Sequence, residues 1–170
     1  MKVEVRRAIP SDAAEVTEIY NYSIVHERNS TFETEGKSVE NRKTWIEEAG
    51  QQYPIMVAVS ENQVVGWASV SAYRQRDCYK GVGEFSIYLH KDFRGKGVGK
   101  QLLRALIEEC ERVGYWKLLS RIFEFNHASR QLCRSLGFRE VGIYEKHGQL
   151  DGRWIDCVIV EKLLPQNMKE

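Results

Sequence analysis

The chain has 170 residues, of which 42% are hydrophobic and 29% are charged. That length and composition are typical of one globular domain with a full core. The formal net charge of +1 provides no general attraction to nucleic acid or to a membrane surface, and no apolar run is long enough to cross a bilayer. We therefore expect a single domain over residues 1–164 and a frayed tail over 165–170.

The cysteines and the first residues bear on the compartment. The four cysteines lie far apart and form no Cys-x-x-Cys pair, which favours buried or half-buried reduced thiols over a disulfide or zinc framework. The sequence opens without the apolar segment of a secretion signal. A cytoplasmic protein is expected, without a metal ion.

Helix and strand patterns alternate from the start of the chain. Residues 3–8 alternate as a first strand, and Pro10-Ser11-Asp12 then begins a helix whose apolar face extends to Tyr20. The polar stretch 21–35 is expected to be a helix end and a loop that folds over a pocket. Ser38 is expected to cap a second helix that ends near Gly50.

The centre of the chain predicts a hairpin followed by a strand and a long helix. Residues 55–60 and 64–73 are two strands joined by a two-residue turn. A polar loop with aromatic residues, 74–83, leads to the central strand 84–89. From 98 to 113 apolar residues recur at helical spacing.

The last third adds a strand, a short helix and a closing hairpin. Residues 116–123 and 126–136 predict the strand and the helix, and 138–144 and 154–163 predict two strands joined by a turn-rich segment around Gly148 and Gly152. Strands that alternate with helices and are flanked by hairpins indicate an α/β or α+β fold around a mixed sheet.

The stretch between the central strand and the long helix carries the strongest functional signal. Gly95, Gly97 and Gly99 stand at every second position directly before the helix. Such a turn lets successive backbone amides point inward, and the positive end of the helix dipole adds to them. The basic residues around it are Arg94, Lys96, Lys100 and Arg104. This stretch predicts a site for a pyrophosphate.

Two other glycine-rich phosphate motifs do not fit. A Walker A loop needs Ser or Thr after its lysine, and here Gln101 follows Lys100. The dinucleotide fingerprint is Gly-x-Gly-x-x-Gly, whereas the spacing here is Gly-x-Gly-x-Gly. An ordinary surface loop is the remaining alternative, for which three regularly spaced glycines before an amphipathic helix would be unusual.

Two motifs resemble those of the GNAT superfamily of acyl-CoA-dependent N-acyltransferases. Arg94-Gly-Lys-Gly97-Val-Gly99 resembles its Arg/Gln-x-x-Gly-x-Gly/Ala motif. The segment from Asn126 to Phe138 resembles Asn-x-x-Ala/Ser-x-x-Leu-Tyr-x-x-x-Gly-Phe, with Cys133 in place of the tyrosine. A wider pattern is similar to the phosphinothricin acetyltransferase family over nearly the whole chain; it consists of Asn21, Thr31-Phe32, Arg76, Tyr79, Glu84, Ser86-Ile-Tyr88 and Trp154-Ile-Asp156.

The resemblance implies a GNAT-type mixed central sheet, flanked by helices and splayed open between its fourth and fifth strands. Acetyl-CoA would insert its pantetheine arm there, pairing with the strand edge at Ile87 and Leu89 as a peptide would. The Leu89 N–H would stabilise negative charge on the thioester carbonyl. The implied cofactor-binding residues are Ile87, Tyr88, Leu89, Arg94, Gly95, Lys96, Gly97, Val98, Gly99, Lys100, Asn126 and Ser129. A plain helix cap is the alternative for Asn126.

Glu84 is the candidate general base, acting directly or through a water molecule. A capping or solvated carboxylate is the alternative at a strand start. Cys133 is expected to pack in the core rather than to serve as the general acid, for which Tyr88 and Tyr144 stay open. We expect His147 to be an exposed turn residue, and the position at which phosphinothricin acetyltransferases carry their histidine is Asp151 here.

The resemblance also implies the acceptor. Phe32, Tyr73, Arg76 and Tyr79 are expected to line its site, where an arginine fork would pair with carboxylate or phosphinate oxygens. The implied reaction is direct acetyl transfer, in a ternary complex, to the amino group of a small amino acid such as phosphinothricin or methionine sulfoximine. Another small amine, a protein acceptor, or a non-catalytic acyl-CoA-binding module are the alternatives. The family resemblance further implies a homodimer.

Overall fold

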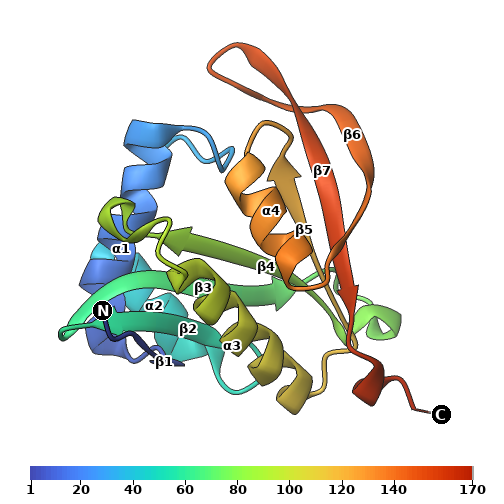
Figure 1. Ribbon diagram of the computed structural model, residues 1–170, viewed down its shortest axis with the longest axis horizontal. Coiled ribbons are helices and arrows are strands. Elements are labelled where there is room, and N and C mark those ends of the chain that lie inside the picture. Colours follow the sequence, from blue (N-terminus) through green and yellow to red (C-terminus); the bar gives the residue numbers. More distant parts are fainter. Residues whose placement is uncertain (170) are drawn as a thin grey trace.

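A twisted sheet of seven strands forms the centre of the molecule in the computed structural model, which describes residues 1–169 (Figure 1). Neighbouring strands are antiparallel except β4 and β5, which run parallel. In spatial order the strands are β1 (Glu4–Arg7), β2 (Ile55–Ser60), β3 (Gln63–Ala72), β4 (Val82–Leu89), β5 (Lys117–Phe123), β7 (Arg153–Leu163) and β6 (Arg139–Leu150).

Helices cover both faces of this sheet. On one face lie α1 (Ala13–Asn21), which continues as a π-helical turn over Tyr22–Glu27, and α2 (Val39–Ala49). The Ser38 side chain caps α2 by accepting a hydrogen bond from the Asn41 N–H at 3.0 Å, as predicted. On the other face lie α3 (Val98–Val113) and α4 (His127–Ser135).

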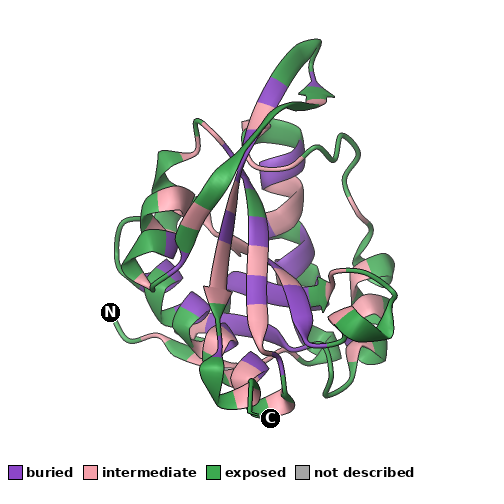
Figure 2. Ribbon diagram, turned by 90° about the vertical axis from the view of Figure 1, so that its right-hand side faces the viewer, coloured by how far each residue is buried: buried purple, intermediate pink, exposed green. Residues whose placement is uncertain are grey.

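The main core lies between α3 and the sheet. Leu102, Leu103 and Leu106 are fully buried against strand residues such as Ala58 and Val65. Burying a leucine side chain stabilises a fold by about 1.5–3 kcal/mol, so the apolar stripe of α3 anchors that helix to the sheet. Figure 2 shows buried residues concentrated along the middle strands, whereas the far end of the β6–β7 hairpin is largely exposed.

The sheet opens between β4 and β5. These two strands pair only from Val82–Lys117 to Glu84–Leu119. One further bridge is the Ser120 hydroxyl, which donates to the Phe85 carbonyl at 3.0 Å. The splayed mixed sheet expected from the sequence is confirmed.

The phase of β4 decides which backbone groups face the opening. The His90 N–H donates to the Val65 carbonyl of β3 at 2.8 Å. Because the direction of the N–H groups alternates along a strand, the N–H groups of Ile87 and Leu89 point the other way, toward β5. Neither has a hydrogen-bonding partner on β5, which is no longer paired there.

The closing hairpin differs from the sequence prediction. Strand β6 continues past Tyr144 and, after an irregularity over residues 145–147, pairs again from Gly148 with Ile155. Gly148, expected in the turn, is therefore a strand residue. The turn is only Asp151-Gly152, both with positive φ. The extra length of β6 comes from its pairing with β7, and the local residue pattern of β6 does not reveal this pairing.

Residues 22–27 continue α1 as a π-helical turn and the loop begins at 28, in agreement with the helix end and loop expected over 21–35. Two smaller expectations need correction. Cys78 is exposed, whereas the other three cysteines are buried. The sequence predicts a frayed tail from 165, but Pro165–Asn167 forms a 3₁₀ turn. The side-chain amide Nδ2 of Asn167 donates to the Glu111 and Tyr115 carbonyls at 2.7 and 2.6 Å. Within residues 1–169 no helix is both long and apolar enough to cross a membrane.

Candidate active site

The glycine-rich turn presents the open N-terminus of α3. Gly95 and Gly97 have φ angles of +73° and +82°, a left-handed conformation that favours glycine. Gly97 is the N-cap residue and offers no side chain to the first-turn amides. A Cβ built on Gly95 or Gly97 would meet no atom within 4 Å. Gly97, Gly99 and Lys100 line a cavity, so the first turn of α3 borders open space, which suits an anionic ligand.

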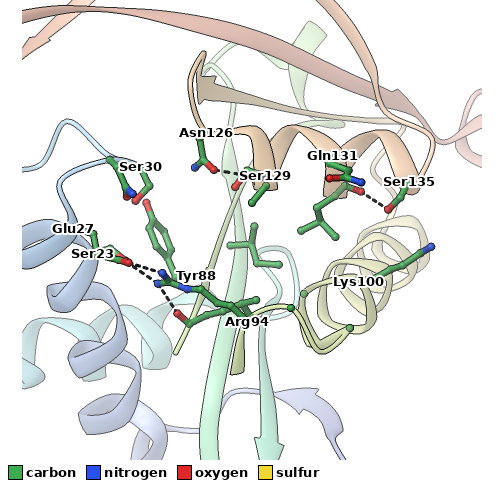
Figure 3. A pocket seen from close by; sticks show the side chains of 18 residues that line it. Ser23, Glu27, Ser30, Tyr88, Arg94, Lys100, Asn126, Ser129, Gln131 and Ser135 are labelled. Atoms are coloured by element: carbon green, nitrogen blue, oxygen red, sulfur yellow. Dashed lines mark hydrogen bonds and ion pairs between the residues drawn. The ribbon is translucent and has the colours of Figure 1, made fainter. Parts of the chain in front are cut away.

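Arg94 lies beside this turn but is already paired. Its Nη2 donates to Glu27 Oε1 at 2.7 Å and to the Leu89 carbonyl at 3.1 Å, and its Nη1 donates to Glu27 Oε2. The hydrogen bond from Arg94 holds the pKa of Glu27 below its usual range. Figure 3 shows the guanidinium turned toward Glu27. Glu27 belongs to the π-helical turn after α1, so this ion pair links that element to the glycine-rich turn.

A cavity of about 630 Å³ extends from the turn along the open edge of β4 to α4. Lys100 of α3 and Gln131 and Ser135 of α4 lie along it (Figure 3). The predicted cofactor residues that line it are Ile87, Tyr88, Leu89, Arg94, Gly95, Gly97, Gly99, Lys100, Asn126 and Ser129. Lys96 and Val98 do not. Lys96 Nζ lies over the Phe93 ring, 5.4 Å from its centroid, and Val98 is buried in the core.

Two residues at the start of and within α4 have clear structural roles. The Asn126 side chain caps the helix by accepting a hydrogen bond from the Ser129 N–H at 3.3 Å. It also lines the cavity, so capping and ligand contact are compatible. Cys133 is buried in the main core, and burial raises its pKa to about 12. The prediction that Cys133 packs in the core is confirmed.

A second cavity of about 280 Å³ adjoins the first. Both are lined by Ser30 and Tyr88, so Tyr88 stands where they meet. Burial raises the pKa of Tyr88, which keeps its phenol protonated at neutral pH. The other residues of the second cavity are Thr31, Phe32, Glu84, Phe85, Ser86, Ser120, Arg121, Phe123, His147, Gly148 and Cys157.

Glu84 projects into the second cavity and is paired with Arg121 of β5. The Arg121 Nε and Nη2 atoms both donate to Glu84 Oε2, at 3.0 and 2.7 Å. Glu84 Oε1 has no hydrogen-bonding partner among residues 1–169. The pair spans β4 and β5 close to the point where they separate. It holds one oxygen of a carboxylate that lines the cavity and leaves the other oxygen without a partner in the described part of the chain.

The loop after α1 covers the second cavity, as the sequence predicts. The Phe32 ring packs against the Phe123 ring, with centroids 4.7 Å apart. A Cβ built on Gly148 would come within 2.7 Å of the Phe32 ring, so any side chain at this position of β6 would displace that ring. Arg28 ties the loop to the hairpin turn through hydrogen bonds of 2.7 and 2.6 Å to Asp151.

Several predicted residues lie apart from this pair of cavities. Tyr73, Arg76 and Tyr79 belong to the loop between β3 and β4, where the rings of Tyr73 and Tyr79 meet edge to face at 5.4 Å. None of the three lines either cavity, and their role in acceptor binding stays a prediction. Asp151 is engaged by Arg28, whose hydrogen bond lowers the pKa of that carboxyl.

Sequence reasoning missed Arg121 and underrated His147. His147 is exposed, as expected, but it lies within β6 rather than in a turn, and it lines the second cavity. Arg121 is a charged residue inside a strand, between Ser120 and the apolar Ile122-Phe123, which is the signal that could have identified it. No group of three or more His, Cys, Asp or Glu side chains in residues 1–169 could hold a metal ion.

Known proteins resemble this chain in sequence and in fold. The profile of the acetyltransferase (GNAT) domain matches residues 5–159. The chain belongs to the GNAT family of acetyltransferases. It is 33% identical, over 96% of its length and 95% of the relative's, to the L-methionine sulfoximine/L-methionine sulfone acetyltransferase of Salmonella typhimurium. The Pseudomonas aeruginosa protein of the same name is 36% identical, with 95% and 94% covered.

Among solved structures, the GNAT chain also resembles a phosphinothricin acetyltransferase from Sinorhizobium meliloti in complex with acetyl-CoA. The TM-score is 0.88 at 34% identity, with 96% of this chain and 89% of that chain covered. The resemblance to phosphinothricin acetyltransferases that the sequence motifs indicated is thereby confirmed.

Proposed function

We propose that this GNAT enzyme transfers the acetyl group of acetyl-CoA to the amino group of a small amino-acid-like acceptor, of the phosphinothricin or methionine sulfoximine type, in a direct ternary complex. The observation that carries the proposal is the meeting of two cavities at Tyr88. One contains the open helix terminus and the free edge of β4; the other contains Glu84. The names of the relatives support the acceptor class.

The first cavity has the groups that acetyl-CoA requires. The first-turn amides of α3 would hold the diphosphate, and Lys100 adds positive charge at the rim. The backbone groups of Ile87 that face the opening would pair with the pantetheine amides, as would the Leu89 carbonyl, which also accepts from Arg94. The Leu89 N–H is left for the thioester. When bound, acetyl-CoA supplies an acetyl thioester activated for transfer to an amine.

Leu89 and Glu84 would take part directly in acetyl transfer, as oxyanion donor and general base. The Leu89 N–H would donate to the carbonyl oxygen of the acetyl group, where negative charge develops; a donor of this kind is worth about 3 kcal/mol. Glu84 Oε1 would accept a proton from the ammonium group of the acceptor, directly or through water. The hydrogen bonds from Arg121 to Oε2 orient the carboxylate for that step.

The test is an acetyl-transfer assay that follows release of the CoA thiol over a panel of amines. We expect turnover with phosphinothricin or methionine sulfoximine, and a kcat about 10²–10⁴-fold lower for Glu84→Gln, because the amide cannot accept the proton. The dissociation constant for acetyl-CoA should hardly change. Arg112→Gln, which removes an exposed arginine from its pair with Glu109 on α3, is the control.

Three results would contradict this proposal in different ways. Normal turnover by Glu84→Gln would show that the Glu84 carboxylate is not the general base. Acetylation of a lysine peptide but of none of the amino acids would make the acceptor a protein. Binding of acetyl-CoA without turnover of any amine would favour a non-catalytic acyl-CoA-binding module.

We also propose that the enzyme is a cytoplasmic homodimer. Five large apolar side chains of β6 and β7 are between 45% and 59% exposed: Val141, Ile143, Tyr144, Trp154 and Leu163. Strand β6 is at the edge of the sheet, where exposed apolar residues and unpaired backbone groups favour association. The free state of all four cysteines suits a reducing compartment.

A further inference from the structure

The second cavity is lined by Arg121, whose guanidinium has hydrogen-bond donors that are not engaged by the described residues. Arg121 uses two of its five N–H donors, one on Nε and one on Nη2, to hold Glu84 Oε2. The two donors on Nη1 and the second on Nη2 have no hydrogen-bonding partner among residues 1–169. The Arg121 side chain is 49% exposed. It is the one arginine or lysine among the residues that line this cavity.

The occupied and the free donors lie on different edges of the planar group. Glu84 takes the edge formed by Nε and Nη2. The edge formed by Nη1 and Nη2 remains, and its two parallel N–H groups match the two oxygens of a carboxylate. The structure therefore offers a bidentate anion site directly beside the carboxylate that receives the ammonium proton.

The Glu84–Arg121 pair has the charge pattern of an α-amino acid in reverse. An α-amino acid carries its ammonium and carboxylate on one carbon atom. Glu84 Oε1 and the free edge of Arg121 present an acceptor and a cation side by side, because the two side chains are only 2.7 Å apart. Phe32 and Phe123 supply an apolar wall for the rest of such a ligand.

We propose that Arg121 binds the α-carboxylate of the acceptor, so that the Glu84–Arg121 pair selects α-amino acids over amines that lack this group. The inference rests on the proposed acetyltransferase function and identifies the residue behind its acceptor specificity. It assigns the anion-binding role to Arg121, which lies in the cavity, rather than to Arg76, which does not line it.

A two-by-two comparison of enzyme and acceptor tests this assignment. Wild type and Arg121→Gln are assayed with methionine sulfoximine and with its α-carboxamide, which keeps the amine and loses the negative charge. Any loss from misplacing Glu84 affects both acceptors and cancels in the ratio of their kcat/KM values. We expect the acid-to-amide ratio to fall 10–100-fold in Arg121→Gln, mainly through a higher KM for the acid.

Arg121→Lys should restore part of the ratio, since it keeps the charge but loses the fork. Arg112→Gln, in the same assays, should leave the ratio at the wild-type value. Protection against thermal unfolding by each acceptor, measured without acetyl-CoA, gives a readout that needs no turnover. In that assay the acid should stabilise wild type more than the amide does, and Arg121→Gln should lose the difference.

The assignment is overturned if the ratio stays the same in Arg121→Gln while both rates fall, because Arg121 would then only position Glu84. It is also overturned if wild type uses the amide as well as the acid, or if Arg76→Ala and not Arg121→Gln removes the preference. Absence of transfer to any amine, combined with stronger thermal protection by the acid than by the amide, would refute the proposed function and leave Arg121 as a carboxylate site.

Discussion

Asp12 is a charged residue that is 5% exposed, at the start of the first helix. Its carboxylate accepts hydrogen bonds from Arg6 at 2.8 and 3.0 Å and from the Ile9 N–H at 2.8 Å. Burial by itself raises the pKa of Asp12, but the hydrogen bonds from Arg6 and Ile9 and the positive charge of Arg6 together outweigh it, and the net pKa is lowered. The ionised side chain thus ties β1 to the beginning of α1.

We expect Asp12→Asn to lower the free energy of unfolding at pH 7 by about 2–3 kcal/mol, since hydrogen bonds to a charged group are lost. A carboxyl whose folded pKa is depressed stabilises the protein fully above its unfolded pKa, about 3.9, and the stabilisation is lost as the pH falls through the folded value. When urea unfolding is measured from pH 7 down to pH 3, the difference in free energy of unfolding between wild type and variant should therefore shrink.

Asp92→Asn is a suitable comparison, since that side chain is 70% exposed and should matter little to stability. A gap for Asp12→Asn that stayed constant down to pH 3 would mean that shape, and not charge, makes Asp12 important.

At the scale of elements, the unit of β4, glycine turn and α3 determines how the cofactor site is built. The turn places Gly97 in a left-handed conformation at the mouth of the helix, with open space in front of it. This geometry is a property of the segment itself. A side chain at that position would both strain the backbone and occupy the space of the ligand.

Gly97→Trp should consequently abolish binding of acetyl-CoA. We expect saturating acetyl-CoA to raise the melting temperature of wild type by several degrees and that of the variant by nothing, because only a ligand that binds the folded state stabilises it. Differential scanning fluorimetry of both proteins measures this. An equal shift in the variant would place the diphosphate elsewhere.

The elements that could be predicted from the sequence are those whose pattern is local. The apolar stripe of α3, the glycine spacing before it and the Ser38 cap depend on residues a few positions apart, and the structure has them where the sequence puts them. The length of β6 could not be predicted, since it depends on pairing with β7 across the hairpin.

The same limit applies to the site. Glu84 and the glycines belong to recognisable motifs, whereas the Glu84–Arg121 pair joins two strands that are 37 residues apart in sequence. The place of Phe32 against Gly148 is equally non-local. Contacts of this kind follow from the register of β4 against β5 and of the hairpin against the loop, which no motif specifies.

For the molecule as a whole, the exposed end of the β6–β7 hairpin predicts association. Light scattering at micromolar concentration should give about twice the chain mass of 19.8 kDa. Trp154→Glu should shift the equilibrium toward the monomer, because Trp154 is 59% exposed and would be buried in a partner contact. Val39→Glu, on α2 at the opposite side of the sheet, is the control. A wild-type mass of 19.8 kDa would count against the dimer.

The opening between β4 and β5 should also affect the rate at which backbone amide hydrogens exchange with solvent. Amides in the middle of a sheet ordinarily exchange with solvent deuterium only when the structure opens, and so are among the slowest in a protein. The Leu89 amide faces the opening, in the fourth strand of seven, with no strand partner. Its hydrogen should exchange as fast as that of a loop amide. In the free enzyme, hydrogen exchange would therefore mark the ligand-binding edge of β4 as a fast-exchanging position among the slowly exchanging amides of the sheet.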